Sequence, residues 1–294
     1  MVIETAKIHK GANQCYDNRY PFLRLVAAAR PNRAKKQMIF VVSGPPGSGK
    51  THWIKECLAK SDGQPSRYFS PQTDSIPIDS ICIDTEFSQV EIIGPTEEGK
   101  LFDASEGATY MELPWYLDLS SIEPQLQKLN CHRVAVVPSG WNSSTLNKEW
   151  QTWADEVVFG NTAQIPEWER SPTNPPQVHR ALLRGEIVDF ASLAVFWFEL
   201  IQGAYGEAIR AKGIFDIISG ESIYGDFVAG TVNREFMALE LPRWLDGRPQ
   251  RFSGLEIVGW DLNREAIAQT IEDCSVPETH IAHYQEQMKQ SLSN

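Results

Sequence analysis

The chain has 294 residues, enough for about two domains of ordinary size. Its composition, 42% apolar and 22% charged residues, excludes wholesale disorder, and no apolar run reaches the roughly 18 residues needed to span a bilayer. The net charge of −11 argues against broad nucleic-acid binding, because a phosphate backbone would be repelled. Five cysteines lie far apart and none forms C-x-x-C, which favours reduced thiols in a cytoplasmic protein.

The first 37 residues differ in charge from the rest of the chain. They contain eight basic and two acidic residues, a net +6. Arg24 and Arg30 interrupt the only apolar stretch, which argues against a secretory signal, whereas an organelle transit peptide fits in part. Because charge runs are usually interaction tails or solvated faces, we expect residues 1–37 to form a basic, solvated N-terminal extension.

A glycine-rich loop follows this extension. Met38–Val42 is a short apolar run with β-branched residues, typical of a strand buried on both faces of a parallel sheet. It leads directly into Gly44–Thr51, which reads GPPGSGKT and completes the pattern G-x-x-x-x-G-K-[ST]. Apolar residues then recur at helical spacing up to Lys60. Strand, loop and helix therefore occur in the order that a P-loop requires.

The residue types of this loop explain its chemistry. Glycines let backbone N–H groups converge on phosphate oxygens, and the new helix directs its positive end to the same point. We expect Lys50 to reach the β- and γ-phosphates and Thr51 to ligate Mg²⁺. The sequence thus predicts binding of GTP or ATP with Mg²⁺, and the loop alone does not select the base. The predicted nucleotide-binding residues are Gly44, Gly47, Ser48, Gly49, Lys50 and Thr51.

Two C-terminal stretches suggest a family. Gly206–Phe215 reads GEAIRAKGIF and Leu255–Cys274 reads LEIVGWDLNREAIAQTIEDC. Together with the loop, these stretches resemble the CobW family, P-loop GTPases proposed as metal chaperones and grouped with UreG and HypB. The resemblance runs from about residue 38 to residue 274. The resemblance implies a C-terminal domain, in which Gly206–Phe215 would form the first strand. Leu255–Cys274 would form its last strand and last helix.

The residues of the closing stretch support the same interpretation. Leu255–Val258 has the composition of a strand, and Asn263 is a plausible helix N-cap. Ile267, Ile271 and Cys274 then form one helical stripe, which we interpret as core packing.

The segment Ile81–Val90 resembles the family's strand followed by the motif N-E-F-G-x-V. Glu86, Phe87 and Val90 match that motif. The resemblance therefore places Asp84 and Glu86 at the carboxyl end of a strand, where open α/β sheets bind ligands. A carboxylate there could reach Mg²⁺, although a surface carboxylate on a loop is an equally good interpretation. The predicted metal residues are Thr51 and Glu86.

Three departures from the family pattern change the expected activity. The thiolates of the metal motif G-C-x-C-C are replaced by Ala108, Tyr110 and Met111, so the family-type metal site is absent. The glutamate that would help to place Mg²⁺ or the attacking water falls at Val137, which predicts slow hydrolysis. The aspartate of the guanine-reading motif falls at Ala163, which predicts a weakened preference for GTP.

The remaining segments set the domain organisation. A proline-rich stretch predicts a linker over residues 166–178, between a P-loop domain over 38–165 and a C-terminal domain over 179–294. Ile187–Gln202 carries apolar residues at helical spacing and should pack on the C-terminal sheet. His280 and His283 form H-x-x-H, which we interpret as solvated residues of a tail. The predicted fold class is α/β, with a mainly parallel P-loop sheet and a smaller α+β domain.

Three functional hypotheses follow. The first is a CobW-like protein whose bound nucleotide acts as a conformational latch for a protein partner, with slow or absent hydrolysis. The second is a non-catalytic assembly module that docks on a larger complex through its C-terminal domain and basic arm. The third is a small-molecule kinase, which lacks a recognisable catalytic base. The sequence leaves nucleotide turnover, the partner and the oligomeric state open.

Overall fold

The computed structural model describes residues 3–6, 38–61, 63–71, 76–94, 96–103, 107–139, 150–160, 174–232 and 236–292. Two compact units divide the chain, one over Ile8–Ile165 and the other over Met1–Lys7 and Pro166–Asn294. Within the described residues, no helix is both long enough and apolar enough to cross a membrane.

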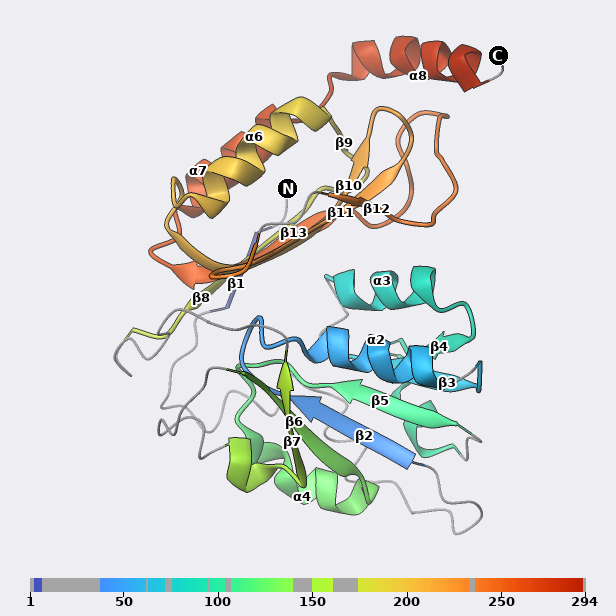
Figure 1. Ribbon diagram of the computed structural model, residues 1–294. Helices are drawn as coiled ribbons and strands as arrows, with labels where there is room; N and C mark the ends of the chain where they lie inside the picture. Colours follow the sequence, from blue (N-terminus) through green and yellow to red (C-terminus); the bar gives the residue numbers. More distant parts are fainter. Residues whose placement is uncertain are drawn as a thin grey trace. The chain divides into compact units, whose positions relative to one another are not determined.

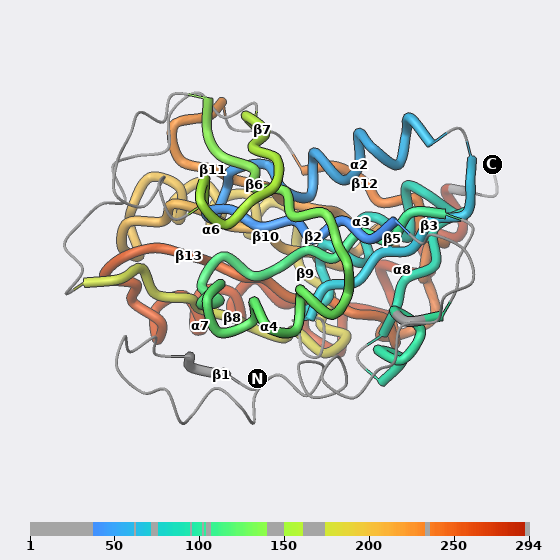
Figure 2. Tube along the Cα trace, turned by 90° about the horizontal axis from the view of Figure 1, so that it is seen from below, coloured from blue at the N-terminus to red at the C-terminus, as the bar shows by residue number. Residues whose placement is uncertain are grey.

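The unit that contains the glycine loop is built on a parallel sheet. Its six described strands lie in the order β4-β3-β5-β2-β6-β7, and each neighbouring pair is parallel. The labels of β7, β6, β2, β5 and β3 follow one another in this sequence in Figure 2. The α/β fold class is thereby confirmed for this part of the chain. The strands are β2 (Met38–Ser43), β3 (Ser66–Phe69), β4 (Val90–Ile92), β5 (Ala108–Glu112), β6 (His132–Pro138) and β7 (Glu156–Gly160).

Helices cover both faces of the parallel sheet (Figure 1). One core joins the sheet to α2 (Lys50–Lys60) and α3 (Ile78–Glu86), and the other joins it to α4 (Leu119–Leu129). A short 3₁₀ helix, η1, spans Glu98–Phe102. Val41 and Val42 are both fully buried, one in each core, as expected for a strand covered on both faces.

The second unit is built on a mainly antiparallel sheet. Its path is β1-β8-β13-β10-β11-β12, and β9 pairs with β10 in parallel. The two units therefore use different sheet types, as the predicted fold class states. The strands are β1 (Ile3–Ala6), β8 (Gln177–Leu182), β9 (Ile187–Val188), β10 (Glu207–Ile217), β11 (Ser222–Val228), β12 (Met237–Ala238) and β13 (Gly254–Trp260). The helices are α6 (Phe190–Ile201), α7 (Arg264–Asp273) and α8 (Glu278–Leu292).

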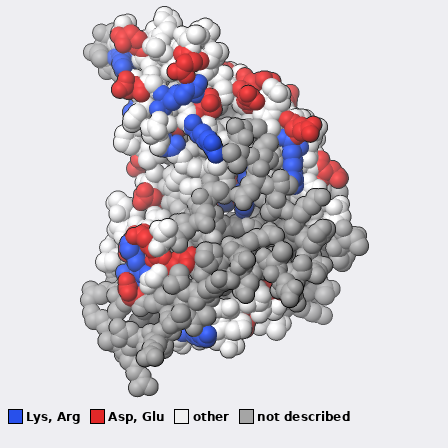
Figure 3. Space-filling model, turned by 180° about the vertical axis from the view of Figure 1, so that it is seen from behind, with Lys and Arg blue, Asp and Glu red and all other residues white. Residues whose placement is uncertain are grey.

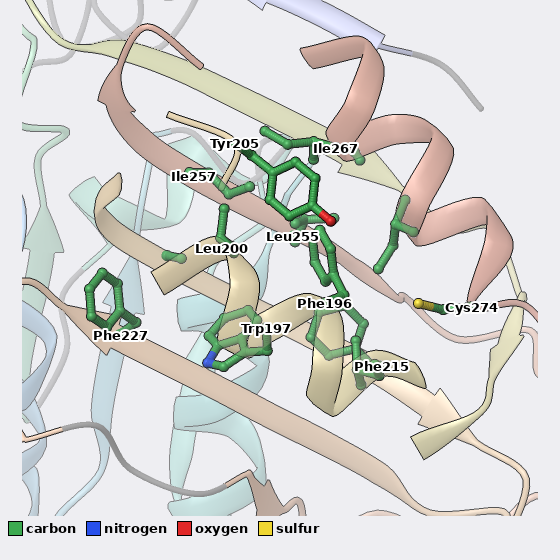
Figure 4. Packing of buried hydrophobic residues seen from close by; sticks show 14 of the residues in the cluster. Phe196, Trp197, Leu200, Tyr205, Phe215, Phe227, Leu255, Ile257, Ile267 and Cys274 are labelled. Carbon is green, nitrogen blue, oxygen red and sulfur yellow. The ribbon is translucent and has the colours of Figure 1, made fainter. Parts of the chain in front are cut away.

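One face of the antiparallel sheet packs against α6 and α7. Figure 4 shows side chains from both helices meeting those of β10, β11 and β13. The predicted stripe Ile267, Ile271 and Cys274 lies in this core, and the Asn263 side chain accepts from the N–H of Ala266 as the N-cap of α7. These expectations for the closing stretch are confirmed.

The opposite face of the same sheet carries a row of charged residues. The register places Arg180, Glu256, Lys212 and Asp226 side by side on four neighbouring strands, with charges that alternate in sign. Arg180 Nε lies 2.7 Å from Glu256 Oε2, and Lys212 Nζ lies 3.6 Å from Glu256 Oε1. Burial alone would raise the pKa of Glu256, but Lys212 and Arg180 outweigh it and lower the pKa to about 2. Attraction between neighbouring side chains of opposite charge therefore stabilises the polar face of this sheet.

The N-terminal residues differ in part from the predicted solvated extension. Ile3–Ala6 form strand β1, which pairs with β8 at the edge of the antiparallel sheet. An edge strand provides unpaired backbone groups that another segment can satisfy, and sequence composition does not show this pairing. The rest of the extension lies outside the described residues, as does most of the predicted linker.

Candidate functional site

The glycine loop lies between β2 and α2 and is shaped by close backbone contacts. Gly44 has φ 151°, and a Cβ there would lie 2.1 Å from the carbonyl oxygen of Val136 on β6. Gly49 has φ 96° and forms the N-cap of α2 in the left-handed region. No side chain of the described residues caps this helix. Its first N–H groups therefore point into the loop, where they favour an anion.

Lys50 folds back onto the loop that precedes it. Its Nζ donates to the carbonyl oxygens of Gly44 and Pro45, both at 3.0 Å, and the residue is only 9% exposed. A buried ammonium is thus held beside the N–H groups of the loop. The arrangement concentrates positive charge at the place where the sequence predicts phosphates.

Thr51 joins this loop to the neighbouring strand. Its Oγ1 donates to the carboxylate of Glu112, at 3.1 Å from Oε1 and 3.0 Å from Oε2. Glu112 is the last residue of β5, which lies next to β2. The Tyr68 hydroxyl, on β3, donates to Glu112 Oε2 at 3.0 Å. The carboxyl ends of three adjacent strands therefore bring a hydroxyl, a carboxylate and a phenol together.

The Glu112 carboxyl and the Tyr68 phenol both lie in a buried environment. Glu112 is 7% exposed, and Tyr68 is fully buried. Burial and the adjacent Glu112 carboxylate raise the pKa of Tyr68 well above its ordinary value, so the phenol stays a neutral donor. Oxygen ligands of this kind are those that Mg²⁺ prefers, with the P-loop hydroxyl as the direct ligand.

Ser48 adds a polar atom without a visible partner. Its Oγ is fully buried and has no hydrogen-bond partner among the described residues. Such an atom is costly unless something satisfies it, and a phosphate oxygen in the loop would do so. Gly160, at the end of β7, also borders the loop, since a Cβ there would lie 2.0 Å from the carbonyl oxygen of Ser48.

The structure brings the predicted loop residues together, and it places Glu86 elsewhere. The expectation that a strand precedes the motif at Thr85–Val90 and ends near Asp84 is wrong: Ile78–Glu86 is helix α3, so Asp84 and Glu86 lie in its last turn. The buried residues Ile78, Cys82 and Ile83 follow a helical period, whereas the strand was expected from the family resemblance alone.

The Glu86 side chain is half exposed, and its Oε2 lies 2.5 Å from Lys55 Nζ on α2. This ion pair connects two helices on one face of the parallel sheet. The role of Glu86 at a metal therefore stays a prediction, whereas Glu112 already contacts Thr51.

Sequence reasoning missed Glu112 and Tyr68. The family's metal motif directs attention to thiolates over residues 107–111, whereas the carboxylate of Glu112 follows directly after them. The available signal is an acidic residue at the end of an apolar strand that precedes a new helix. The residues at the place of the guanine-reading motif, 161–163, lie outside the described residues.

A metal cluster of another kind is not found in the described part of the chain. No three or more His, Cys, Asp or Glu residues there are grouped to hold a metal ion. His280 and His283 lie on α8, and both are exposed. His283 Nε2 is 3.0 Å from Gln287 Nε2, a contact within the same helix.

Fold and site together define an α/β domain of the P-loop type joined in one chain to an antiparallel sheet domain. No protein-family model matches the chain, and no curated protein matches it either. Among solved structures, it is similar to the Zn(II)-bound YjiA GTPase from E. coli, with a TM-score of 0.29 and 13% identity over 82% of this chain and 99% of that one. A Zn(II)-bound triple mutant of YjiA GTPase gives a TM-score of 0.29, 12% identity and the same coverage. Scores this low carry no inference about function, which has to rest on the site.

Proposed function

We propose that this chain binds a nucleoside triphosphate, GTP or ATP, together with Mg²⁺ at the loop Gly44–Thr51, as a CobW-like protein. The observation that carries the proposal is the contact of Thr51 Oγ1 with the Glu112 carboxylate, beside the Lys50 ammonium. A glycine loop by itself would need no such acid. A hydroxyl and a carboxylate on adjacent strand ends form the usual magnesium side of a P-loop site.

The residues fit the ligands in shape and in charge. Lys50 would bind the β- and γ-phosphates, and the uncapped N-terminus of α2 would bind the same anion. Thr51 would ligate the cation, and Glu112 would hold it directly or through water. Bound Mg²⁺ would neutralise charge between the phosphates. The buried Ser48 hydroxyl would gain the acceptor that the described residues do not provide.

The proposal includes slow hydrolysis and a role as a latch. Val137 is 3% exposed near the end of β6, where the CobW resemblance expects a glutamate. Phosphoryl transfer depends on positioning and charge stabilisation, so an aliphatic residue there offers no help to water. A nucleotide that is bound and only slowly hydrolysed can hold a conformation that a protein partner recognises.

A titration with fluorescent GTP and ATP analogues, with and without Mg²⁺, tests the proposal. We expect Lys50→Ala to weaken binding by about 100-fold, because a charged phosphate contact is lost. Glu112→Gln should weaken the Mg²⁺ dependence of binding by about 10-fold or more and leave Mg²⁺-free affinity unchanged.

The matched control is Glu86→Gln, which removes a carboxylate that contacts Lys55 rather than Thr51. It should leave the Mg²⁺ dependence intact, and the reverse outcome would assign the metal role to Glu86. If neither analogue binds at millimolar concentration, the nucleotide proposal is wrong.

A further inference from the structure

Helix α6 carries large apolar side chains on its exposed side as well as on its buried side. Leu193, Phe196, Trp197 and Leu200 face the core of the antiparallel sheet. On the same helix, Val195 is 58% exposed and Phe198 is 61% exposed. The sequence predicts that this helix packs on the C-terminal sheet, and its inner side does so. The structure adds that Val195 and Phe198 lie on its outer side.

The exposed residues of α6 form a continuous stripe. Ala191, Val195 and Phe198 are spaced i, i+4 and i+7, so they follow one line opposite the buried residues. Phe190, 47% exposed, begins the helix beside this line. The stripe covers about two turns, or roughly 12 Å along the helix. Apolar side chains on both sides of a helix are normally covered by other elements.

Three carboxylates lie beside this stripe, and none has a basic partner within the described residues. Asp189 and Glu199 flank it on α6, and Asp273 lies on α7, which packs beside α6. The Asp189 N–H donates to the carbonyl oxygen of Cys274, next to Asp273, and Glu199 shares the Tyr205 hydroxyl with Thr270 of α7, so the acids lie along the side of α6 that faces α7. Among the described residues none of the three forms an ion pair. They accept instead from Ser192, the Tyr205 hydroxyl and Gln269.

The charge of this helix layer contrasts with the rest of the unit. Residues 189–202 and 261–274 contain six acidic residues and one basic residue, Arg264. On the opposite face of the sheet, Glu256 and Asp226 are each paired with basic side chains. On the face drawn in Figure 3, basic and acidic side chains of the described residues lie next to one another in several places. Uncompensated acid beside an apolar stripe is therefore a local feature of α6 and α7.

We propose that this α6 surface, defined by Phe190, Ala191, Val195 and Phe198 and bordered by Asp189, Glu199 and Asp273, binds a basic amphipathic helix of a protein partner. Such a helix places apolar anchors at i, i+3 or i+4, and i+7 along the stripe and positions lysine or arginine at the acidic border. A second copy of the chain is a poorer occupant, because two acidic borders would repel each other. The proposal does not depend on nucleotide binding at the P-loop.

Fluorescence anisotropy with designed 18-residue peptides tests this inference on the full chain. One peptide carries leucines at i, i+3 and i+7 with lysine and arginine beside them, and the other has the same leucines with glutamate. We expect the basic peptide to bind at least 10-fold more tightly than the acidic one, with weaker binding at high salt. Equal binding of the two peptides would overturn the proposal.

Variants then locate the binding surface. Val195→Lys combined with Phe198→Lys should weaken the basic peptide by at least 10-fold, since it removes the anchor contacts and adds repulsion. Val232→Lys is the matched control, because Val232 is 90% exposed and lies outside α6. Both variants change exposed positions, so circular dichroism should show unchanged folding. If the double variant binds as well as the wild type, the surface is not on α6.

Other occupants are recognised by separate outcomes. A dimer in sedimentation velocity that the Val195→Lys and Phe198→Lys changes abolish would assign the face to a second copy. If the basic peptide binds only after Arg24→Glu and Arg30→Glu, the chain's own basic segment covers the face. Either outcome would overturn the proposal of a separate partner.

Discussion

The two sheets of this chain use their polar groups in opposite ways. The parallel sheet is covered on both faces. The polar side chains of Thr51, Tyr68 and Glu112 meet at the carboxyl ends of its strands. The antiparallel sheet has one apolar face, and its charges lie across the other face in a row. A sheet buried on both faces can place functional polar side chains only at the ends of its strands. A sheet covered on one side can also carry them on its open face.

The same difference separates nucleotide binding from partner binding. Nucleotide binding depends on atoms from several strand ends that must keep their mutual positions. Partner binding depends on side chains along the outer side of α6 and on the carboxylates beside them. Changes in the parallel sheet should therefore disturb ligand binding and folding together, while changes on α6 should alter binding alone.

The largest expected effect is the loss of a charge on the polar face of the antiparallel sheet. Glu256→Gln leaves Arg180 and Lys212 facing each other without the carboxylate between them. Breaking a buried pair costs about 3–5 kcal/mol in the free energy of unfolding, and we expect the lower end of that range because Arg180 and Glu256 are 15% and 13% exposed. Hydrogen exchange of β8 and β13 amides would measure the loss within this unit.

The control is Glu278→Gln, whose partner Arg248 is part of an exposed pair, and it should cost less than about 1 kcal/mol. If the two variants are equally stable, the charged row is not the source of cohesion on this face.

The second effect is acid sensitivity on the apolar face. His179 is 1% exposed, and neither ring nitrogen has a hydrogen-bond partner among the described residues. Burial, and then Arg264, lower the pKa of His179 from 6.5 to about 4. The unfolded chain therefore binds a proton that the folded chain rejects, and stability falls by on the order of 3 kcal/mol as pH drops from 6.5 to 4.

Urea unfolding across this pH range measures the effect. His179→Leu should flatten the pH dependence between 6.5 and 4, whereas the exposed-residue variant His283→Gln should not. A His179→Leu protein with the wild-type pH dependence would show that another group is responsible.

The third effect concerns Gly160, the last residue of strand β7 in the parallel sheet. Gly160→Ala places a Cβ 2.0 Å from the Ser48 carbonyl oxygen, so the loop or β7 has to move. We expect a loss of about 1–3 kcal/mol in the free energy of unfolding, together with weaker binding of fluorescent nucleotides. Gly99→Ala is the control, because nothing lies within 4 Å of its added Cβ. Unchanged nucleotide affinity in Gly160→Ala would separate β7 from the site.

The smallest effect concerns the helix layer on the antiparallel sheet. Asn263→Ala removes the cap that accepts from the Ala266 N–H at 3.1 Å. The expected cost is about 1 kcal/mol in the free energy of unfolding, and Asn263→Asp should restore most of it. Thermal unfolding of the three proteins would measure this order, and an uncapped variant as stable as the wild type would contradict it.

Several features could be predicted from the sequence because they depend on local spacing. Met38–Val42, the loop and α2 follow from an apolar run, a glycine pattern and a 3.6-residue period, and the structure contains all three. The cap at Asn263 and the stripe that ends at Cys274 are of the same kind. The resemblance to the family's strand and motif does not predict helix α3 at Ile78–Glu86, whose buried residues follow a helical period.

By itself, the sequence determined the α/β class, the glycine loop and the position of Lys50 and Thr51 within it. Only the tertiary structure decided which carboxylate meets Thr51, because Glu112 lies 61 residues away and is brought close by strand order rather than by spacing. The same holds for the outer side of α6. A helix with large apolar side chains on opposite sides does not show in its sequence which side the sheet will cover, and packing against β10 and α7 made that choice.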